Sequence, residues 1–132
     1  MEYVTLNNGI QMPMEGFGVF QVPDYQECED VVYHAIQSGY RLIDTAAAYM
    51  NEKAVGNAIQ RAIQDGIVKR EDLFITTKLW VQDYNHVQEA INCSLDLLEL
   101  DYIDLYLLHQ AMGDYFSAWR AMEDAYKEGK LK

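Results

Sequence analysis

The amino-acid sequence predicts an α/β fold, in which helices join parallel strands. Short apolar runs of strand length alternate with longer stretches in which apolar residues recur at helical spacing. This alternation occurs four times along the 132 residues, and a helical crossover between strands makes them parallel. Half of the residues are hydrophobic and 23% are charged, which is typical of a globular domain with a sizeable core.

An N-terminal hairpin precedes the alternation. Apolar residues alternate along Val4–Leu6 and Ile10–Met12, and Asn8-Gly9 stands between these two runs. Asn-Gly adopts the positive φ angles that a two-residue hairpin turn requires, so we expect such a turn here. Pro13 ends the second arm.

Four apolar runs are predicted to form the strands of the sheet. They are Gly16–Phe20, Arg41–Ile43, Leu73–Thr77 and Tyr102–Leu108. Each is short, and glycine or polar residues bound it.

Capping residues and glycines delimit the four predicted helices. The first begins at Asp24 and stops at Gly39, and the second begins at Glu52 and stops at Gly66. The third opens at Asn85. The fourth spans about Tyr115–Glu128, and the apolar residues expected to be buried on it are Phe116, Trp119, Met122 and Tyr126.

Two closures fit this pattern: an open doubly wound sheet and a barrel. The open sheet usually carries G-x-G-x-x-G in its first strand-to-helix turn, and the run after Gly16-Phe17-Gly18 breaks that motif, so the barrel is favoured. A TIM (β/α)₈ barrel needs eight units and about 250 residues. We therefore expect residues 1–132 to form one domain, half of such a barrel, with exposed sheet edges that a second copy in a homodimer could cover.

Composition excludes several classes of partner. The net charge of −11 argues against nucleic acid and anionic membranes. Cys28 and Cys93 lie far apart with no C-x-x-C motif, so no metal site is expected. No apolar run approaches the ~18 residues of a membrane span, and no secretory leader opens the chain, so a cytoplasmic location is expected.

Three predicted strands end on an ionisable residue. Asp44, Lys78 and His109 follow the second, third and fourth strands, and strand alternation places each on the same face of the sheet. If that face lines a barrel, these groups converge at its C-terminal mouth, where active sites lie in this fold. Tyr49, five residues after Asp44, adds a phenol; the alternative is a capping aspartate and a packed tyrosine.

These residues resemble a known family. The stretch GYRLIDTAAAYMNEKAVG, from Gly39 to Gly56, is similar to the first signature of the aldo-keto reductases. GFGVFQVPD, LFITTKLW and DYIDLYLLHQ resemble the family's first, third and fourth strands, and the hairpin resembles the one that closes the bottom of its barrel. The likeness is closest to small bacterial reductases of diketo-acids and aldehydes. Its catalytic tetrad would be Asp44, Tyr49, Lys78 and His109.

The resemblance implies an NADPH-dependent reduction of a small carbonyl substrate. A hydride passes from NADPH to the carbonyl carbon, and Tyr49 donates a proton to the developing alkoxide. The Lys78 ammonium eases release of that proton, and Asp44 holds Lys78. His109 orients the carbonyl oxygen.

Further site residues follow from the same motifs. Phe20 and Trp80 would form apolar walls of the substrate pocket together with His109. Gly18 and Val19, with Asp44, would lie beside the nicotinamide.

The resemblance also has departures. Ala111 stands where the family usually has proline, and Glu15 where an apolar residue is common. The family's further cofactor contacts, a Ser-Asn pair, a stacking Tyr and a basic phosphate-binding segment, would all lie beyond Lys132. We therefore expect an incomplete NADPH site and weak or no turnover.

Two other functions stay open. One is a non-catalytic half-barrel that assembles with itself or with a partner through its exposed edges. The other is aldolase chemistry through a Schiff base on Lys78, against which its expected pairing with Asp44 argues.

Overall fold

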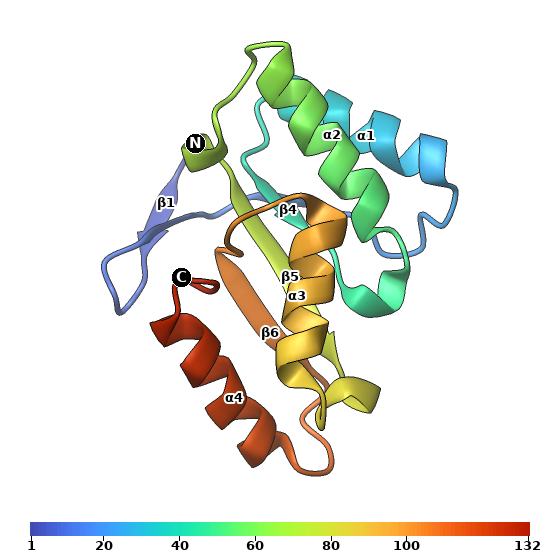
Figure 1. Cartoon of the computed structure of the whole chain (residues 1–132). Coiled ribbons are helices and arrows are strands. Elements are labelled where there is room, and N and C mark those ends of the chain that lie inside the picture. The colour runs from blue at the N-terminus through green and yellow to red at the C-terminus, as the bar shows by residue number, and fades with distance from the viewer.

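Four parallel strands form the centre of the computed structural model, which describes residues 1–132 (Figure 1). They lie side by side in chain order, each bonded to the next. The strands are β3 (Gly16–Gly18), β4 (Leu42–Asp44), β5 (Phe74–Trp80) and β6 (Leu105–His109). The predicted α/β class with four strand–helix units is confirmed.

A helix follows each strand, and the helices cover one face of the sheet. Right-handed crossovers between neighbouring parallel strands place successive helices on the same side. Figure 1 shows α1 and α2 side by side, with α3 across the sheet near β5 and β6. The helices are α1 (Tyr25–Gln37), α2 (Glu52–Gln64), α3 (Val87–Leu98) and α4 (Tyr115–Lys127).

The core lies between the sheet and these helices. Ile43, Ile75 and Leu79 point toward the helices and are completely buried. Side chains alternate along a strand, so the neighbours of these residues point the other way. That second face is open toward β6, where Leu107 is 38% exposed.

The hairpin of β1 (Tyr3–Thr5) and β2 (Gln11–Pro13) lies at the N-terminal ends of the parallel strands, where it lines a common hollow with Phe74. The Asn8 amide donates to the Lys132 carbonyl at 2.7 Å, which ties the hairpin to the end of the chain. The hairpin is confirmed, but the predicted two-residue turn is wrong.

The turn is longer because Leu6 and Ile10 remain hydrogen-bonded to each other outside β1 and β2. Within it only Gly9 has a positive φ, +86°. A turn closed by one left-handed glycine is a common alternative to the two-residue form.

Several strand boundaries differ from prediction. β3 ends at Gly18, before the predicted Phe20, and β4 spans Leu42–Asp44 in place of Arg41–Ile43.

β5 continues to Trp80, because β6 pairs with it from Thr76 to Trp80, so Lys78 lies within the strand and does not end it. β6 begins only at Leu105, because the Asp104 carboxylate accepts from the Ile75 N–H and pairs with Arg70.

Two predictions about helices are also wrong. His86, and not Asn85, is the N-cap of α3, and it makes no side-chain capping bond. On α4 only Met122 of the four expected core residues is buried, because small Ala118 and Ala125 share the face that contacts the core. The aromatic residues of α4 that are exposed are Phe116, Trp119 and Tyr126.

Three short 3₁₀ turns connect strands and helices: η1 (Ala47–Tyr49), η2 (Arg70–Asp72) and η3 (Val81–Asp83). Among the helices, none combines the length and apolarity needed to cross a lipid bilayer.

Gly56 is required where α2 meets α3. A Cβ atom there would lie 2.5 Å from the Leu97 carbonyl oxygen and 2.8 Å from the Leu98 Cα, and backbone atoms cannot move aside cheaply. Gly56→Ala should therefore lower the free energy of unfolding by about 1–3 kcal/mol, although alanine is the better helix former. Urea unfolding measures this. Gln64→Ala, at the exposed end of the same helix, should change it by less than about 0.5 kcal/mol, and equal effects would contradict the packing argument.

Candidate active site

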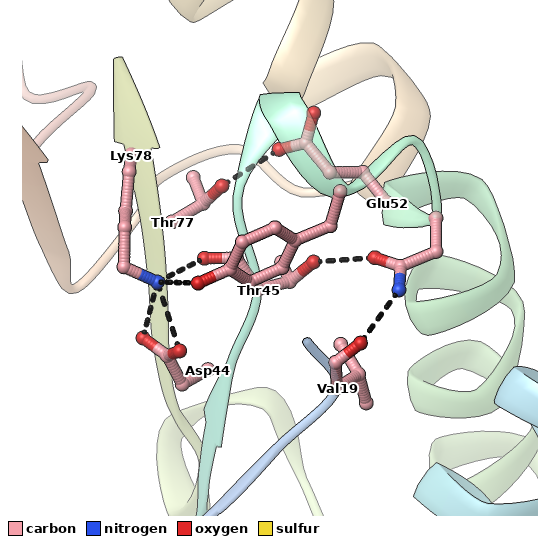
Figure 2. Close-up of polar contacts among 8 residues, drawn as sticks. Val19, Asp44, Thr45, Glu52, Thr77 and Lys78 are labelled. Carbon is pink, nitrogen blue, oxygen red and sulfur yellow. Dashed lines mark hydrogen bonds and ion pairs between the residues drawn. The ribbon is translucent and has the colours of Figure 1, made fainter. Parts of the chain in front are cut away.

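Lys78 is the centre of a polar cluster at the C-terminal end of the sheet (Figure 2). Its Nζ lies 2.9 and 2.8 Å from the two carboxylate oxygens of Asp44. It also donates to the Thr45 carbonyl at 2.8 Å and contacts the Tyr49 hydroxyl oxygen at 3.3 Å. The Lys78 side chain is 13% exposed and that of Asp44 33%, so the ammonium is the more shielded partner of this ion pair.

Parallel register brings the ion pair together. Asp44 is the last residue of β4 and lies opposite Thr76 of β5. Lys78 follows Thr76 by two residues and therefore points from the same face, one step nearer the C-terminal end. The short η1 turn after β4 then brings Tyr49 back over Lys78.

The contact with Lys78 makes the Tyr49 hydroxyl oxygen a hydrogen-bond acceptor. An ammonium has three N–H groups and accepts nothing, so the Tyr49 oxygen can only accept from it. The Tyr49 hydrogen is then free to point elsewhere. The group can therefore donate a proton to a molecule bound on the open face.

His109 lies beside Tyr49. Their rings meet edge-to-face, with centroids 5.8 Å apart, and His109 meets Trp80 in the same way at 5.1 Å. The His109 Nδ1 is buried with no hydrogen-bond partner. Burial lowers the pKa of His109, the Lys78 ammonium lowers it further, and the Asp44 carboxylate raises it.

Apolar aromatic rings border the cluster on both sides. Phe20 tilts against Tyr49 at 5.1 Å and is 65% exposed, and Trp80 stands beside His109. The rings thus form a row from Phe20 through Tyr49 and His109 to Trp80, and both predicted substrate walls border the polar centre.

Of the three residues expected near a nicotinamide, Gly18 and Asp44 are accessible. Gly18 pairs with Asp44 across β3 and β4, and a Cβ on Gly18 would meet only the Asp44 Oδ2 within 4 Å, at 3.9 Å. Val19 is completely buried in the core, because strand alternation turns it toward the helices. Its side chain therefore faces the helices, and its expected place beside a nicotinamide stays a prediction.

Left-handed backbone follows three of the site residues. Gln21, Met50 and Gln110 have φ values of 62°, 59° and 73°, and each comes directly after a ring of the aromatic row. Residues other than glycine rarely adopt such angles, and those that do cluster at functional sites. Nothing in the local sequence predicts these conformations.

Sequence reasoning also missed a pair of buried polar residues beside the cluster. Asn51 and Glu52 are each 3% exposed at the start of α2. In the sequence they look like an ordinary helix start, and the only available signal was that two adjacent polar residues follow Tyr49 and Met50 in the signature stretch.

The cluster fits only part of a dinucleotide. Gly18 leaves room beside Asp44 for a flat ring. Lys78 is the cluster's only cation, and Asp44 already neutralises it, so no free cation remains there for a phosphate. No group of three metal-ligating side chains occurs in the structure.

Comparison with known proteins agrees with the fold and the motifs. The model of the aldo/keto reductase family matches residues 15–132. An uncharacterized oxidoreductase of Bacillus subtilis, YtbE, is 50% identical over 97% of this chain and 47% of its own length. The glyoxal reductase of the same organism is 47% identical over 98% of the chain and 46% of its own.

A solved structure gives the same result. The crystal structure of a Bombyx mori aldo-keto reductase in complex with NADP matches with a TM-score of 0.91 and 39% identity, over 98% of this chain and 48% of that one. The chain therefore spans about half the length of the relatives that it matches.

Substitutions at the ion pair should move the His109 pKa in opposite directions. Lys78→Met removes the cation that lowers this pKa, so it should rise; Asp44→Asn removes the anion that raises it, so it should fall. Titration of the imidazole ¹H and ¹⁵N resonances measures both. Lys53→Met removes a lysine from a separate ion pair with Glu99 and should leave the His109 pKa unchanged. Shifts of the same sign in both site variants would refute the arrangement.

Proposed function

The chain belongs to the aldo/keto reductase family, and we propose that it carries the proton-donor site of an NADPH-dependent carbonyl reductase. The observation that supports this most directly is the Lys78 ammonium in contact with both Asp44 and the Tyr49 oxygen. We also propose that residues 1–132 form one partial-barrel domain.

In this proposal Tyr49 donates the proton to the carbonyl oxygen. Its hydrogen points away from Lys78, and the ammonium stabilises the phenolate that remains after transfer. Asp44 holds the ammonium in place from two oxygens. Because its three N–H groups already have partners, Lys78 is poorly placed to attack a carbonyl, which argues against a Schiff base.

His109 positions the substrate oxygen. Its lowered pKa keeps the imidazole neutral near pH 7, and a neutral imidazole has one N–H to donate to a carbonyl. The edge-to-face contact between the two rings places the His109 imidazole next to the Tyr49 phenol. Two donors can thus converge on one oxygen.

The proposed substrate is a small aldehyde or ketone, such as the glyoxal named for one relative. Phe20 and Trp80 would enclose the carbon chain between apolar rings. A small dicarbonyl suits this narrow row of rings and needs no charged partner.

NADPH is the proposed coenzyme, in keeping with the NADP-bound relative, and when bound it would supply the hydride. Gly18 and Asp44 would contact its nicotinamide end. Its phosphates find no free cation in the cluster, so the 132-residue chain should bind it weakly. With both cysteines free, one of them exposed, we propose a reducing, cytoplasmic location.

A chimera tests the proposal. Residues 1–132 are joined to the half of the Bacillus subtilis glyoxal reductase that they do not match, and NADPH oxidation by glyoxal is followed at 340 nm. The chimera should turn over, whereas the 132-residue chain should show little or no activity. Tyr49→Phe in the chimera should lower kcat about 10²-fold or more, because general acid catalysis typically contributes that much.

Tyr25→Phe provides the matched control, because this tyrosine is exposed on α1, away from the cluster, and should leave kcat unchanged. Full activity of the Tyr49→Phe chimera would exclude Tyr49 as the proton donor. Robust turnover by the 132-residue chain would contradict the expected weakness of its coenzyme site.

A second candidate function is self-assembly, favoured by the exposed apolar residues around α4 and the edge strand β6. Trp119 is 53% exposed and Phe116 67% exposed, and Trp119 borders an apolar hollow between α4 and β6. A second copy in a homodimer could cover this surface and the unpaired edge of β6.

If this assembly forms, sedimentation of the 132-residue chain at micromolar concentration should give a dimer. Trp119→Lys should shift the equilibrium toward monomer, whereas Met50→Lys, at a residue 89% exposed beside the active-site cluster, should not. A stable monomer of the unsubstituted chain would rule the homodimer out.

A further inference from the structure

We propose that Asn51 and Glu52 are positioning residues that hold Tyr49, Asp44 and Lys78 in register from the helix side of the sheet. The proposal deepens the proposed function, since it concerns the same proton-donor cluster. It rests on the hydrogen bonds of two adjacent buried side chains, whose partners adjoin site residues in the chain.

Asn51 connects two loops of the site. Its Oδ1 accepts from the Thr45 hydroxyl at 2.7 Å, and its Nδ2 donates to the carbonyls of Val19 and Val22 at 3.0 and 3.2 Å. Thr45 directly follows Asp44, and Val19 and Val22 flank the segment that carries Phe20. The Thr45–Asn51 bond closes a short loop on which Tyr49 lies.

Glu52 makes the corresponding connection to β5. Its Oε2 accepts from the Thr77 hydroxyl at 2.8 Å, and its Oε1 accepts from the Ser94 hydroxyl of α3 at 3.2 Å. Thr77 directly precedes Lys78 and points to the opposite face of the sheet. Figure 2 shows the bond between Thr77 and Glu52 together with the contacts between Lys78 and Asp44.

The burial of Glu52 is costly for a residue with only a packing role. Burial raises its pKa, and its two hydroxyl partners offset this in part. No cation forms an ion pair with it, and the other ionisable group it influences is the buried Tyr106 hydroxyl, whose pKa its charge helps to raise. An apolar side chain would avoid the cost of burying a carboxylate, so the hydrogen bonds themselves are the feature that Glu52 provides.

The two connections explain how Tyr49 stays over Lys78. Left-handed Met50 caps the η1 turn, and Asn51 and Glu52 follow it directly. The hydrogen bonds of these two side chains therefore hold the chain within three residues of the Tyr49 phenol. Thr45 and Thr77 fix β4 and β5 beside the ion pair. The positions of the reactive groups on the open face thus depend on hydrogen bonds formed on the helix side of the sheet.

Three buried threonines permit a matched test in the 132-residue chain. Thr45 and Thr77 donate to Asn51 and Glu52, whereas the Thr76 hydroxyl is buried with no partner. Thr45→Val and Thr77→Val each remove one connecting bond with almost no change of shape. Thr76→Val makes the same chemical change on the same strand and serves as the control.

The measurement is the ¹H NMR signal of the His109 ring, assigned with His109→Gln, and its NOE to the Tyr49 ring. Because the two rings meet edge-to-face, a displaced Tyr49 changes the His109 shift and weakens the NOE. Thr45→Val and Thr77→Val should produce both changes. Thr76→Val should produce neither, and Thr45→Ser and Thr77→Ser, which keep the hydroxyl, should restore the original signals.

This readout does not depend on turnover, so an inactive chain leaves the test intact. If a valine variant does not fold, Glu52→Gln replaces one acceptor oxygen with a donor at constant shape and should move the same signals. Unchanged His109 signals in the folded Thr45 and Thr77 variants, or in Glu52→Gln, would overturn the proposal. Equal changes in Thr76→Val would do the same.

Discussion

The ion pair between Lys78 and Asp44 is the interaction on which the geometry of the candidate site depends. It joins two neighbouring strands across the open face of the sheet, and both carboxylate oxygens approach the ammonium within 2.9 Å. These two contacts hold the ammonium in place. Because an ammonium can only donate, the Tyr49 oxygen beside it must accept. The Tyr49 hydrogen is therefore left available to a group other than Lys78.

The site lies on one face of the sheet and is supported from the other. Alternation along β5 turns Lys78 toward the open face and Thr77 toward the helices, so neighbouring residues serve the two faces. On the helix side of the sheet, Asn51 and Glu52 at the start of α2 accept hydrogen bonds from Thr45 and Thr77. Long side chains on the open face would be poorly ordered without such support, because ordering them costs conformational entropy.

The chain belongs to the aldo/keto reductase family and spans about half the length of its relatives. The half seen here contains the polar cluster, the row of aromatic rings and the hairpin. The cluster offers no free cation for a coenzyme phosphate. In the proposed function residues 1–132 carry the proton-donor groups, whereas the aromatic residues of α4 remain exposed on the surface.

Local pattern determined the sequence-level predictions that held. Helical and strand periodicity predicted the α/β class, and the position of Asp44, Lys78 and His109 after apolar runs predicted that they would meet, because parallel strands bring equivalent ends together. Tertiary structure decided the rest. Strand register extended β5 past Lys78, two alanines turned the aromatic residues of α4 outward, and contacts between distant segments buried Val19, Asn51 and Glu52. Sequence periodicity reports which residues favour burial, whereas only the packing of segments far apart in the chain decides which neighbour each one meets.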